Sequence, residues 1–275
     1  MDNSYTRLRA NNIAGGGVSV TYSVDMDFTL IGGRYSDEIK PSIKEEMRIA
    51  GCDTIDLLHI PSWDKRCCQP EELKSLLKEL QPSYIEIPMY HPEDSIGKDS
   101  LGEIKAFCDA SSVTELREMT PKMIRNINDS HSSRLILSSG NSFQITFDND
   151  VVGLFNQGRF SVLNTGFIKT DKIVEKICQR ELPSINIMIL NDGAESANEV
   201  WATLIKKKKP TILIDTTNNS YYILKDTNPE SMGISTRKTE RGDILIFSGI
   251  RRIESEIDAN KEGNISGMKY KTESV

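Results

Sequence analysis

Hydrophobic positions along the chain follow two periods, which predict β-strands and α-helices in alternation. Runs rich in β-branched and other apolar residues, bounded by Gly, Pro, Asn or Asp, predict strands over residues 18–24, 28–31, 54–60, 84–88, 134–138, 142–147, 160–163, 185–190, 211–215, 233–236 and 243–247. Helical periodicity predicts helices over residues 41–50, 71–80 and 197–207, and the first ends at Gly51. This order predicts an α/β protein.

Two parts of the chain repeat the order strand, loop, helix, strand. The first contains the irregular loop 61–68, and the second contains the loop 191–194. Residues 134–147 predict a hairpin, and residues 233–247 predict a closing hairpin. Since these two units and their hairpins follow one another directly, the pattern indicates no boundary between separate domains.

The composition is that of a globular protein, with 37% hydrophobic and 27% charged residues in a chain of 275. No long Pro-, Gly- or Ser-rich linker divides it, and single domains commonly reach roughly 250 residues. We therefore expect residues 1–260 to form a single domain. The charged segment 261–275 is expected to be a flexible C-terminal tail.

Charge and cysteine usage narrow the class of protein. The net charge of −6 argues against broad, non-specific binding to nucleic acid. The basic run 206–209 directly precedes Pro210 and a buried strand, so we interpret it as a solvated helix end. Five cysteines without a C-x-x-C pair indicate reduced thiols. With no signal peptide and no membrane-spanning apolar run, these features indicate a cytoplasmic protein.

A strand followed by a polar loop carries a resemblance to a known family. Residues 55–58 read Ile-Asp-Leu-Leu, and residues 62–67 read Ser-Trp-Asp-Lys-Arg-Cys. This resembles the metallo-β-lactamase fold, in the branch of the ComEC-type competence hydrolase domain, where a similar strand leads into the metal loop His-Trp-Asp-x-Asp-His. Ser62, Arg66 and Cys67 fall in the His, Asp and His slots. The resemblance implies a four-layer αββα sandwich with two mixed sheets.

Other segments resemble further motifs of that family in the same order. Residues 13–17 resemble its glycine-containing strand start, and residues 30–33 resemble the glycine-containing end of its second strand. Residues 128–131 resemble an Asn/Ser-containing strand of the family. Phe167 stands where the family has a bridging aspartate, and residues 191–194 replace a double-histidine loop. The candidates for a degenerate site are therefore Ser62, Asp64, Arg66, Cys67, His131, Phe167, Asn191 and Asp192.

These replacements remove most of the side chains that hydrolysis in this fold requires. The reaction depends on metal ions that lower the pKa of bound water, and Arg66 and Phe167 cannot hold a cation. We expect no catalytic residues and no metal. As a fallback, Asp64, Cys67 and Asp192 could hold one zinc or manganese ion, with His131 as an outlying fourth group.

Two histidines and a cysteine pair have separate interpretations. His59 and His91 are interpreted as structural, because they lie beside apolar strands and show no carboxylate at useful spacing. A thiolate nucleophile at Cys67-Cys68, beside two cationic residues, is disfavoured because no histidine stands near as a base.

The leading hypothesis is a catalytically degenerate protein that acts as a regulatory or scaffold subunit by binding a protein partner or an anionic ligand. Lys65 and Arg66 would bind a nucleotide or nucleic acid; alternatively, Arg66 pairs with an acidic neighbour. The family resemblance extends this hypothesis to antiphage defence. The alternative is a divergent metal-dependent nuclease or phosphodiesterase that uses the fallback ligands.

Overall fold

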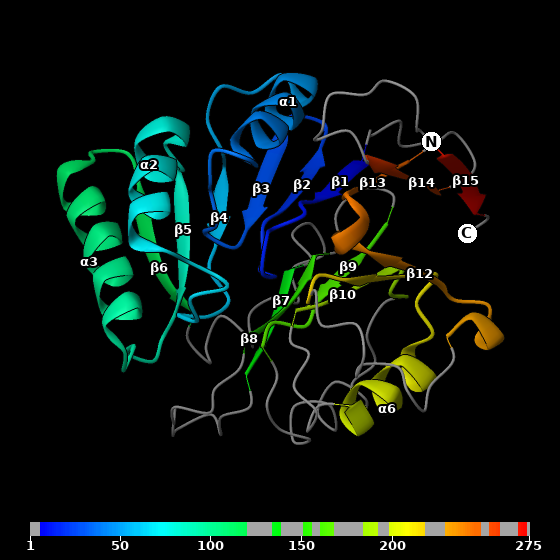
Figure 1. The fold of residues 1–275 in the computed structure, drawn as a ribbon. Helices are drawn as coiled ribbons and strands as arrows, with labels where there is room; N and C mark the ends of the chain where they lie inside the picture. Colours follow the sequence, from blue (N-terminus) through cyan, green and yellow to red (C-terminus); the bar gives the residue numbers. More distant parts are fainter. Residues whose placement is uncertain are drawn as a thin grey trace.

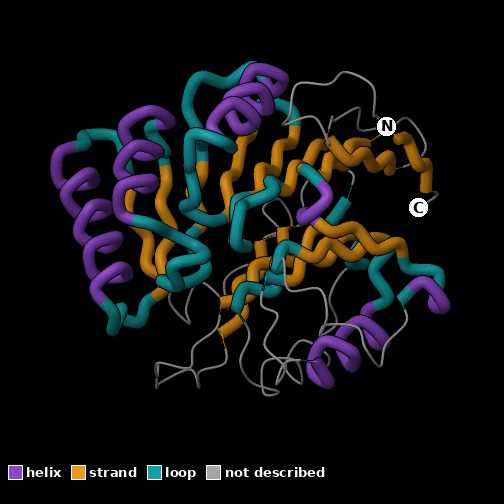
Figure 2. Tube along the Cα trace, in the orientation of Figure 1, coloured by secondary structure: helices purple, strands orange, loops and turns teal. Residues whose placement is uncertain are grey.

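Two β-sheets and the helices that cover them make up the computed structural model of this chain (Figures 1 and 2). The structure describes residues 6–119, 134–138, 151–155, 160–167, 184–191, 198–217, 229–248, 253–258 and 269–273. The helices of this part are α1 (Lys40–Ala50), α2 (Pro70–Leu80), α3 (Ser95–Ala110) and α6 (Asn198–Lys208), with the short 3-10 helices η2 (Glu230–Met232) and η3 (Thr239–Arg241).

The first sheet has nine strands in the described part of the chain and is mixed. Its strands, in sheet order, are β15 (Lys269–Glu273), β14 (Ile253–Asp258), β13 (Asp243–Ser248), β1 (Thr6–Ala10), β2 (Val20–Val24), β3 (Asp27–Ile31), β4 (Leu57–His59), β5 (Tyr84–Pro88) and β6 (Glu115–Met119). Strands β3 to β6 are parallel, and the other neighbours are antiparallel.

The second sheet is also mixed, and six of its strands are described. In sheet order they are β12 (Ser235–Lys238), β11 (Ile212–Asp215), β10 (Ile187–Leu190), β9 (Val162–Asn164), β8 (Val151–Phe155) and β7 (Arg134–Ser138). Strands β9 to β12 are parallel. Helices α1 to α3 lie against the first sheet and α6 lies beyond the second (Figure 1), which confirms the predicted αββα sandwich.

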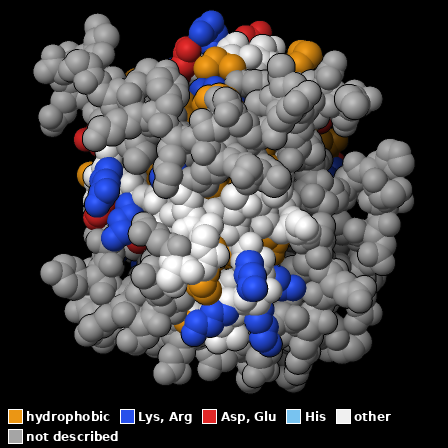
Figure 3. Space-filling model, turned by 90° about the vertical axis from the view of Figure 1, so that its right-hand side faces the viewer, with side chains coloured by type: hydrophobic (Ala, Val, Ile, Leu, Met, Phe, Trp, Pro, Cys, Tyr) orange, Lys and Arg blue, Asp and Glu red, His pale blue; other side chains and the backbone are white. Residues whose placement is uncertain are grey.

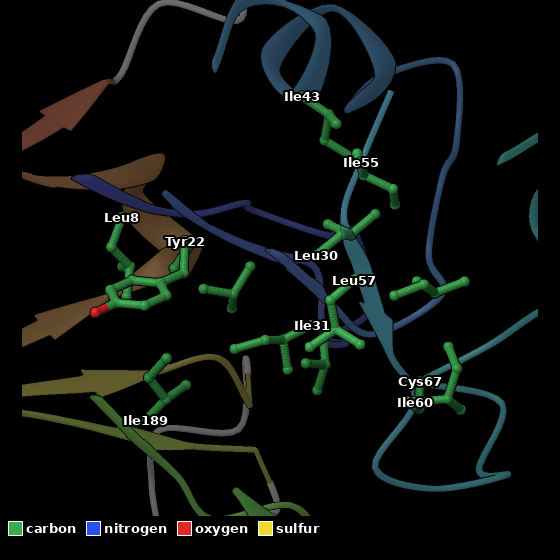
Figure 4. Packing of buried hydrophobic residues seen from close by; sticks show 14 of the residues in the cluster. Leu8, Tyr22, Leu30, Ile31, Ile43, Ile55, Leu57, Ile60, Cys67 and Ile189 are labelled. Carbon is green, nitrogen blue, oxygen red and sulfur yellow. The ribbon is translucent and has the colours of Figure 1, made fainter. Parts of the chain in front are cut away.

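Apolar side chains between the two sheets form the core. The ring of Tyr22 lies 6.2 Å from that of Phe155 and 6.0 Å from that of Phe160, and its hydroxyl donates to the carbonyl of Phe160 at 3.2 Å. Leu8 and Tyr22 point from the first sheet towards Ile189 of the second (Figure 4). Burial of these apolar surfaces from both sheets provides the main driving force for packing one sheet on the other.

Helix boundaries follow local sequence signals. In α2 the buried residues are Leu73, Leu76, Leu77 and Leu80, a spacing that places all four on one face. Helix α1 ends at Gly51, whose φ of 75° is readily adopted only by glycine. Helix α3, which the sequence pattern did not predict, begins at Asp94, whose carboxylate accepts a hydrogen bond from the Gly97 backbone N–H at 2.6 Å.

The predicted closing hairpin is wrong. Strand β12 pairs with β11 in the second sheet, whereas β13 lies between β1 and β14 in the first. The physical reason is burial: residues 243–246 are all buried, as in a central strand covered on both faces, and a terminal hairpin would leave one face in water. Gly242, with φ of 133°, and η3 redirect the chain between the two sheets.

Two other expectations fall partly outside the described residues. Strand β7 pairs with β8, while the predicted partner 142–147 lies outside them. Within the segment 261–275, strand β15 pairs with β14, and the rest of the expected tail is not described. No helix in the described part of the chain is long and apolar enough to cross a bilayer.

A buried ionic network fastens α1 to the first sheet. Arg9 donates to the Asp243 carboxylate at 3.0 and 2.7 Å and to the hydroxyl of Ser42 at 3.0 Å, and it lies 3.5 Å from Glu46. The other oxygen of Asp243 accepts from the Asn12 backbone N–H at 2.7 Å. Because Asp243 joins β13 to β1 and α1, the charges stabilise each other only when all three elements are in place.

We predict that Asp243→Ala lowers the free energy of unfolding by about 3–5 kcal/mol, because it leaves the Arg9 guanidinium buried beside fewer acceptors. Urea unfolding followed by circular dichroism measures the change. The control is Glu45→Ala, which removes an exposed ion pair with Arg48 on α1 and should change stability little. Equal effects of the two substitutions would contradict the network's role.

Candidate functional site

The carboxyl ends of the parallel strands in both sheets meet at one edge of the sandwich, where ligands commonly bind in open α/β sheets. The loop that follows β4 lies there beside residues 16–18 and the end of β11. The backbone N–H of Val18 donates to the Arg66 carbonyl at 2.9 Å, and that of Gly17 donates to the Thr216 carbonyl at 3.5 Å. Residues 16–18 therefore connect a loop of the first sheet to a loop of the second.

Glycines permit this close approach. A Cβ atom on Gly16, whose φ is 81°, would lie 2.8 Å from the Thr217 carbonyl oxygen. A Cβ on Gly17 would lie 2.8 Å from the Arg66 carbonyl oxygen and 3.2 Å from Nη1 of Arg34. The glycine run that the sequence shows is thus needed for contact between backbones.

The loop after β4 is held together by the residues that stand in the expected ligand slots. The hydroxyl of Ser62 accepts from the Asp64 backbone N–H at 3.1 Å, and Asp64 Oδ1 accepts from the Arg66 backbone N–H at 2.9 Å. The Asp64 carbonyl accepts from the N–H groups of Cys67 at 2.7 Å and Cys68 at 3.1 Å. These contacts order the turn without a metal ion.

Arg66, Asp64 and Phe167 form a compact group, which we call the Arg66 cluster. Nε and Nη2 of Arg66 donate to the two carboxylate oxygens of Asp64, each at 2.9 Å. Cζ of Arg66 lies 4.7 Å from the centroid of the buried Phe167 ring, within the range of a cation–π contact. Three residues assigned separately to ligand slots are thus brought together, and the pairing of Arg66 with an acidic neighbour is confirmed.

The Arg66 cluster is accessible to solvent. The side chain of Arg66 is 33% exposed and that of Asp64 is 28% exposed. Lys65, predicted with Arg66 to bind an anion, is exposed beside them. Arg34, which the sequence reasoning missed, pairs with Glu72 at 2.9 and 3.0 Å close to Gly17. Both arginines at this edge are therefore paired with carboxylates, and Lys65 adds an exposed cationic group.

The second sheet contributes a row of polar side chains at its strand ends. Asn191 donates from its amide to the Asn164 side-chain oxygen, and Thr216 donates to Asn191 Oδ1 at 3.1 Å. Asn191 is therefore part of a buried hydrogen-bonded row. Sequence reasoning missed Asn164 and Thr216. Asn164 ends the buried strand β9 and Thr216 directly follows the buried strand β11, so a polar residue at the end of an apolar strand was a usable signal.

The two adjacent cysteines are buried. Burial raises the pKa of the Cys67 thiol well above its usual value and raises that of Cys68 to about 12. Cys67 belongs to the apolar core, where it lies beside Ile60 (Figure 4). The thiolate is the nucleophilic form, so neither cysteine is suited to act as a nucleophile.

The fallback metal site is only partly covered by the structure. Asp192 and His131 lie outside the described residues. Of the fallback ligands that are described, Asp64 has both oxygens on Arg66, and Cys67 is a buried thiol. Across the described ranges, no three His, Cys, Asp or Glu side chains gather closely enough to hold a metal ion.

His59 has a carboxylate partner that sequence spacing did not reveal. Its Nδ1 lies 3.0 Å from Glu86 Oε2, and both side chains are fully buried. The two residues are 27 positions apart but directly opposite in the parallel register of β4 and β5. The ring of His59 also meets that of Phe155 edge-on at 5.3 Å, so this histidine joins the two sheets, whereas His91 is exposed.

The basic run lies away from the Arg66 cluster. Lys206, Lys207 and Lys208 occupy the last turn of α6, which leads into the beginning of β11, the end opposite to Thr216. Lys206, Lys207 and Lys209 are exposed, and Figure 3 shows Lys and Arg side chains gathered on this side of the molecule. This confirms the interpretation of a solvated helix end.

Comparison with solved structures identifies the fold of this chain. No protein-family model matches the chain, and neither does any curated protein. Among solved structures, YhfI of Bacillus subtilis, described as a metallo-β-lactamase fold protein, matches with a TM-score of 0.54 and 9% identity over 86% of this chain and 96% of that chain. The chain has the metallo-β-lactamase fold.

Two further solved structures match at similar levels. Igni18, a metallo hydrolase from Ignicoccus hospitalis, has a TM-score of 0.51 and 12% identity over 88% of this chain and 98% of that chain. CmlA, a diiron β-hydroxylase from Streptomyces venezuelae, has a TM-score of 0.54 and 9% identity over 85% of this chain and 52% of that chain. At these identities the similarity establishes the metallo-β-lactamase fold and leaves the chemistry of this chain to its own residues.

The raised thiol pKa values lead to a prediction about reactivity. Since the thiolate is the reactive form, Cys67 and Cys68 should resist iodoacetamide in the native protein at neutral pH and react on unfolding. Cys52 and Cys108, which are partly exposed, should be alkylated first. Peptide mass mapping over time measures the order, and early labelling of Cys67 would show that its thiol is accessible and activated.

Proposed function

We propose that this chain is a catalytically degenerate protein of the metallo-β-lactamase fold, of the ComEC-type branch, that acts by binding rather than by hydrolysis. The observation that carries the proposal is the Arg66 cluster, in which a guanidinium is held by Asp64 and stacked on Phe167. The protein serves as a regulatory or scaffold subunit, and its ligand is anionic.

The residues around Arg66 do not fit a metal centre of the usual kind. A hydrolytic metal needs imidazole, carboxylate or thiolate donors and an open position for water. Asp64 accepts from Arg66 with both oxygens, Cys67 is buried in the apolar core, and Phe167 has no donor atom. The permanent charge of the guanidinium would repel a divalent cation placed beside it.

The same charge suits an anion. Arginine binds carboxylate and phosphate through two parallel hydrogen bonds, and Lys65 adds a second cationic group at the same loop. Because the whole chain carries a charge of −6, attraction of an anion depends on local cationic groups such as these. The ligand that fits is a nucleotide or a nucleic-acid end.

The biological setting belongs to the same proposal. A protein that binds nucleic-acid ends without cutting them acts through a partner, so we place this chain in a larger assembly. The ComEC-type resemblance extends the proposal to systems that act on foreign nucleic acid, including antiphage defence. Reconstitution with a partner would establish the assembly, whereas the ligand can be tested on the chain by itself.

Metal content tests the degenerate character of the site. Protein purified without chelators should contain far less than one zinc or manganese ion per chain, and Asp64→Ala should leave that content unchanged. Inductively coupled plasma mass spectrometry measures both. A stoichiometric metal that disappears in Asp64→Ala would overturn the proposal and favour the divergent nuclease or phosphodiesterase.

Ligand binding tests the role of the guanidinium. A 5′-phosphorylated oligonucleotide at saturating concentration should raise the melting temperature by a few degrees, since a ligand that binds only the folded state stabilises it. Arg66→Gln should abolish this rise, as measured by scanning fluorimetry.

The chain offers a matched control for that substitution. Arg117 also donates to a carboxylate two positions earlier, Glu115, at 2.9 and 3.0 Å, and it stacks on Tyr84 at 3.8 Å. Arg117→Gln therefore removes the same kind of guanidinium from the edge strand β6. A thermal shift lost equally in both variants, or kept in Arg66→Gln, would count against binding at Arg66.

A further inference from the structure

Asp64 occupies the edge of the Arg66 guanidinium that an incoming phosphate would use. Its two oxygens accept from Nε and Nη2 in the side-by-side geometry that phosphate also adopts. The ring of Phe167 covers one face of the guanidinium. A bidentate anion that reaches Arg66 at this edge must displace the carboxylate.

We propose that Asp64 is a built-in competitor for the anion site at Arg66, and that the ligand able to displace it is a terminal phosphate monoester. This rests on the proposed function, in that it assumes anion binding at Arg66. It adds the chemical class of the ligand and the residue that sets how tightly any anion binds.

The geometry allows Asp64 to leave. Its side chain is 28% exposed, so the displaced carboxylate can turn into water without the cost of burying an unpaired charge. The turn that contains it keeps the hydrogen bond from the Asp64 backbone N–H to Ser62 and those from Cys67 and Cys68 to the Asp64 carbonyl. Displacement of the carboxylate is therefore a local event.

Charge selects the ligand. A phosphodiester carries one negative charge, as Asp64 does, so exchanging one for the other gains little. A phosphate monoester carries about 1.5 to 2 negative charges at neutral pH and presents three terminal oxygens. It can neutralise Arg66 and the exposed Lys65 together. A dianionic terminal phosphate therefore competes with Asp64 more effectively than an internal diester does.

Competition with Asp64 predicts how the affinities of both ligands change when its charge is removed. Since every anion that binds Arg66 at this edge must displace Asp64, Asp64 weakens all of them by the same factor and leaves their ratio unchanged. Removing its charge should strengthen each affinity by up to about fivefold, the factor expected for a partly exposed ion pair of good geometry. A diester too weak to measure in the wild type should then become measurable.

The test uses isothermal titration calorimetry with two probes, a thymidine dinucleotide with a 5′-phosphate and the same dinucleotide without it. The variant is Asp64→Asn, because the amide oxygen can still accept from the Arg66 backbone N–H that Oδ1 accepts now at 2.9 Å. The matched control is Glu115→Gln, which releases Arg117 from a like pair and changes the net charge equally. Circular dichroism confirms that each variant is folded.

The expected result has three parts. The wild type binds the 5′-phosphorylated probe at least about tenfold more tightly than the unphosphorylated one, a difference set by the second charge. Asp64→Asn binds both probes more tightly with a similar ratio. Glu115→Gln binds as the wild type does.

Other results separate the two proposals. Equal affinity of the wild type for both probes overturns this inference, and so does the absence of a gain in Asp64→Asn. In either case the proposed function stands as long as binding depends on Arg66. An equal gain in Glu115→Gln overturns it too, because the effect would then follow net charge. No binding of either probe by the wild type and by Asp64→Asn overturns both proposals. The wild-type comparison needs no variant, so it decides the ligand class even if Asp64→Asn does not fold.

Discussion

The Arg66 guanidinium, paired with Asp64 and stacked on Phe167, connects the parts of the candidate site that the two sheets contribute. Asp64 and Arg66 belong to the loop after β4 in the first sheet, and Phe167 follows β9 in the second. The loops of the two sheets are thus joined by hydrogen bonds and a cation–π contact.

The scaffold beneath the site is held by interactions that owe nothing to a ligand. Apolar side chains between the sheets form most of the core, and the network around Arg9 and Asp243 fixes α1 to β1 and β13. His59 and Glu86 add a buried polar contact between β4 and β5. A site on such a scaffold can exchange catalysis for binding, since the positions of the loops are set by the sheets.

Elements with strong local periodicity were predicted well. Strands β3 and β5 and helices α1 and α2 lie within a residue of their expected bounds, because alternation and helix-end signals are local. Strand β1 was missed because Arg7 and Arg9 interrupt its apolar pattern. Their partners Glu46 and Asp243 lie far along the chain, so nothing nearby in the sequence shows that these arginines are paired and that Arg9 is buried.

By itself, the sequence determined the strands and helices with strong local periodicity, the order of the loops and the residue types at the expected ligand positions. Only the tertiary structure decided which of these residues meet: Arg66 with Phe167, Asn191 with Asn164 and Thr216, and His59 with Glu86. The tertiary structure also decided that β12 and β13 lie in different sheets. The physical reason is that sheet order, which brings distant strand ends together, follows from burial of whole faces, whereas sequence periodicity records only which face of each element is buried.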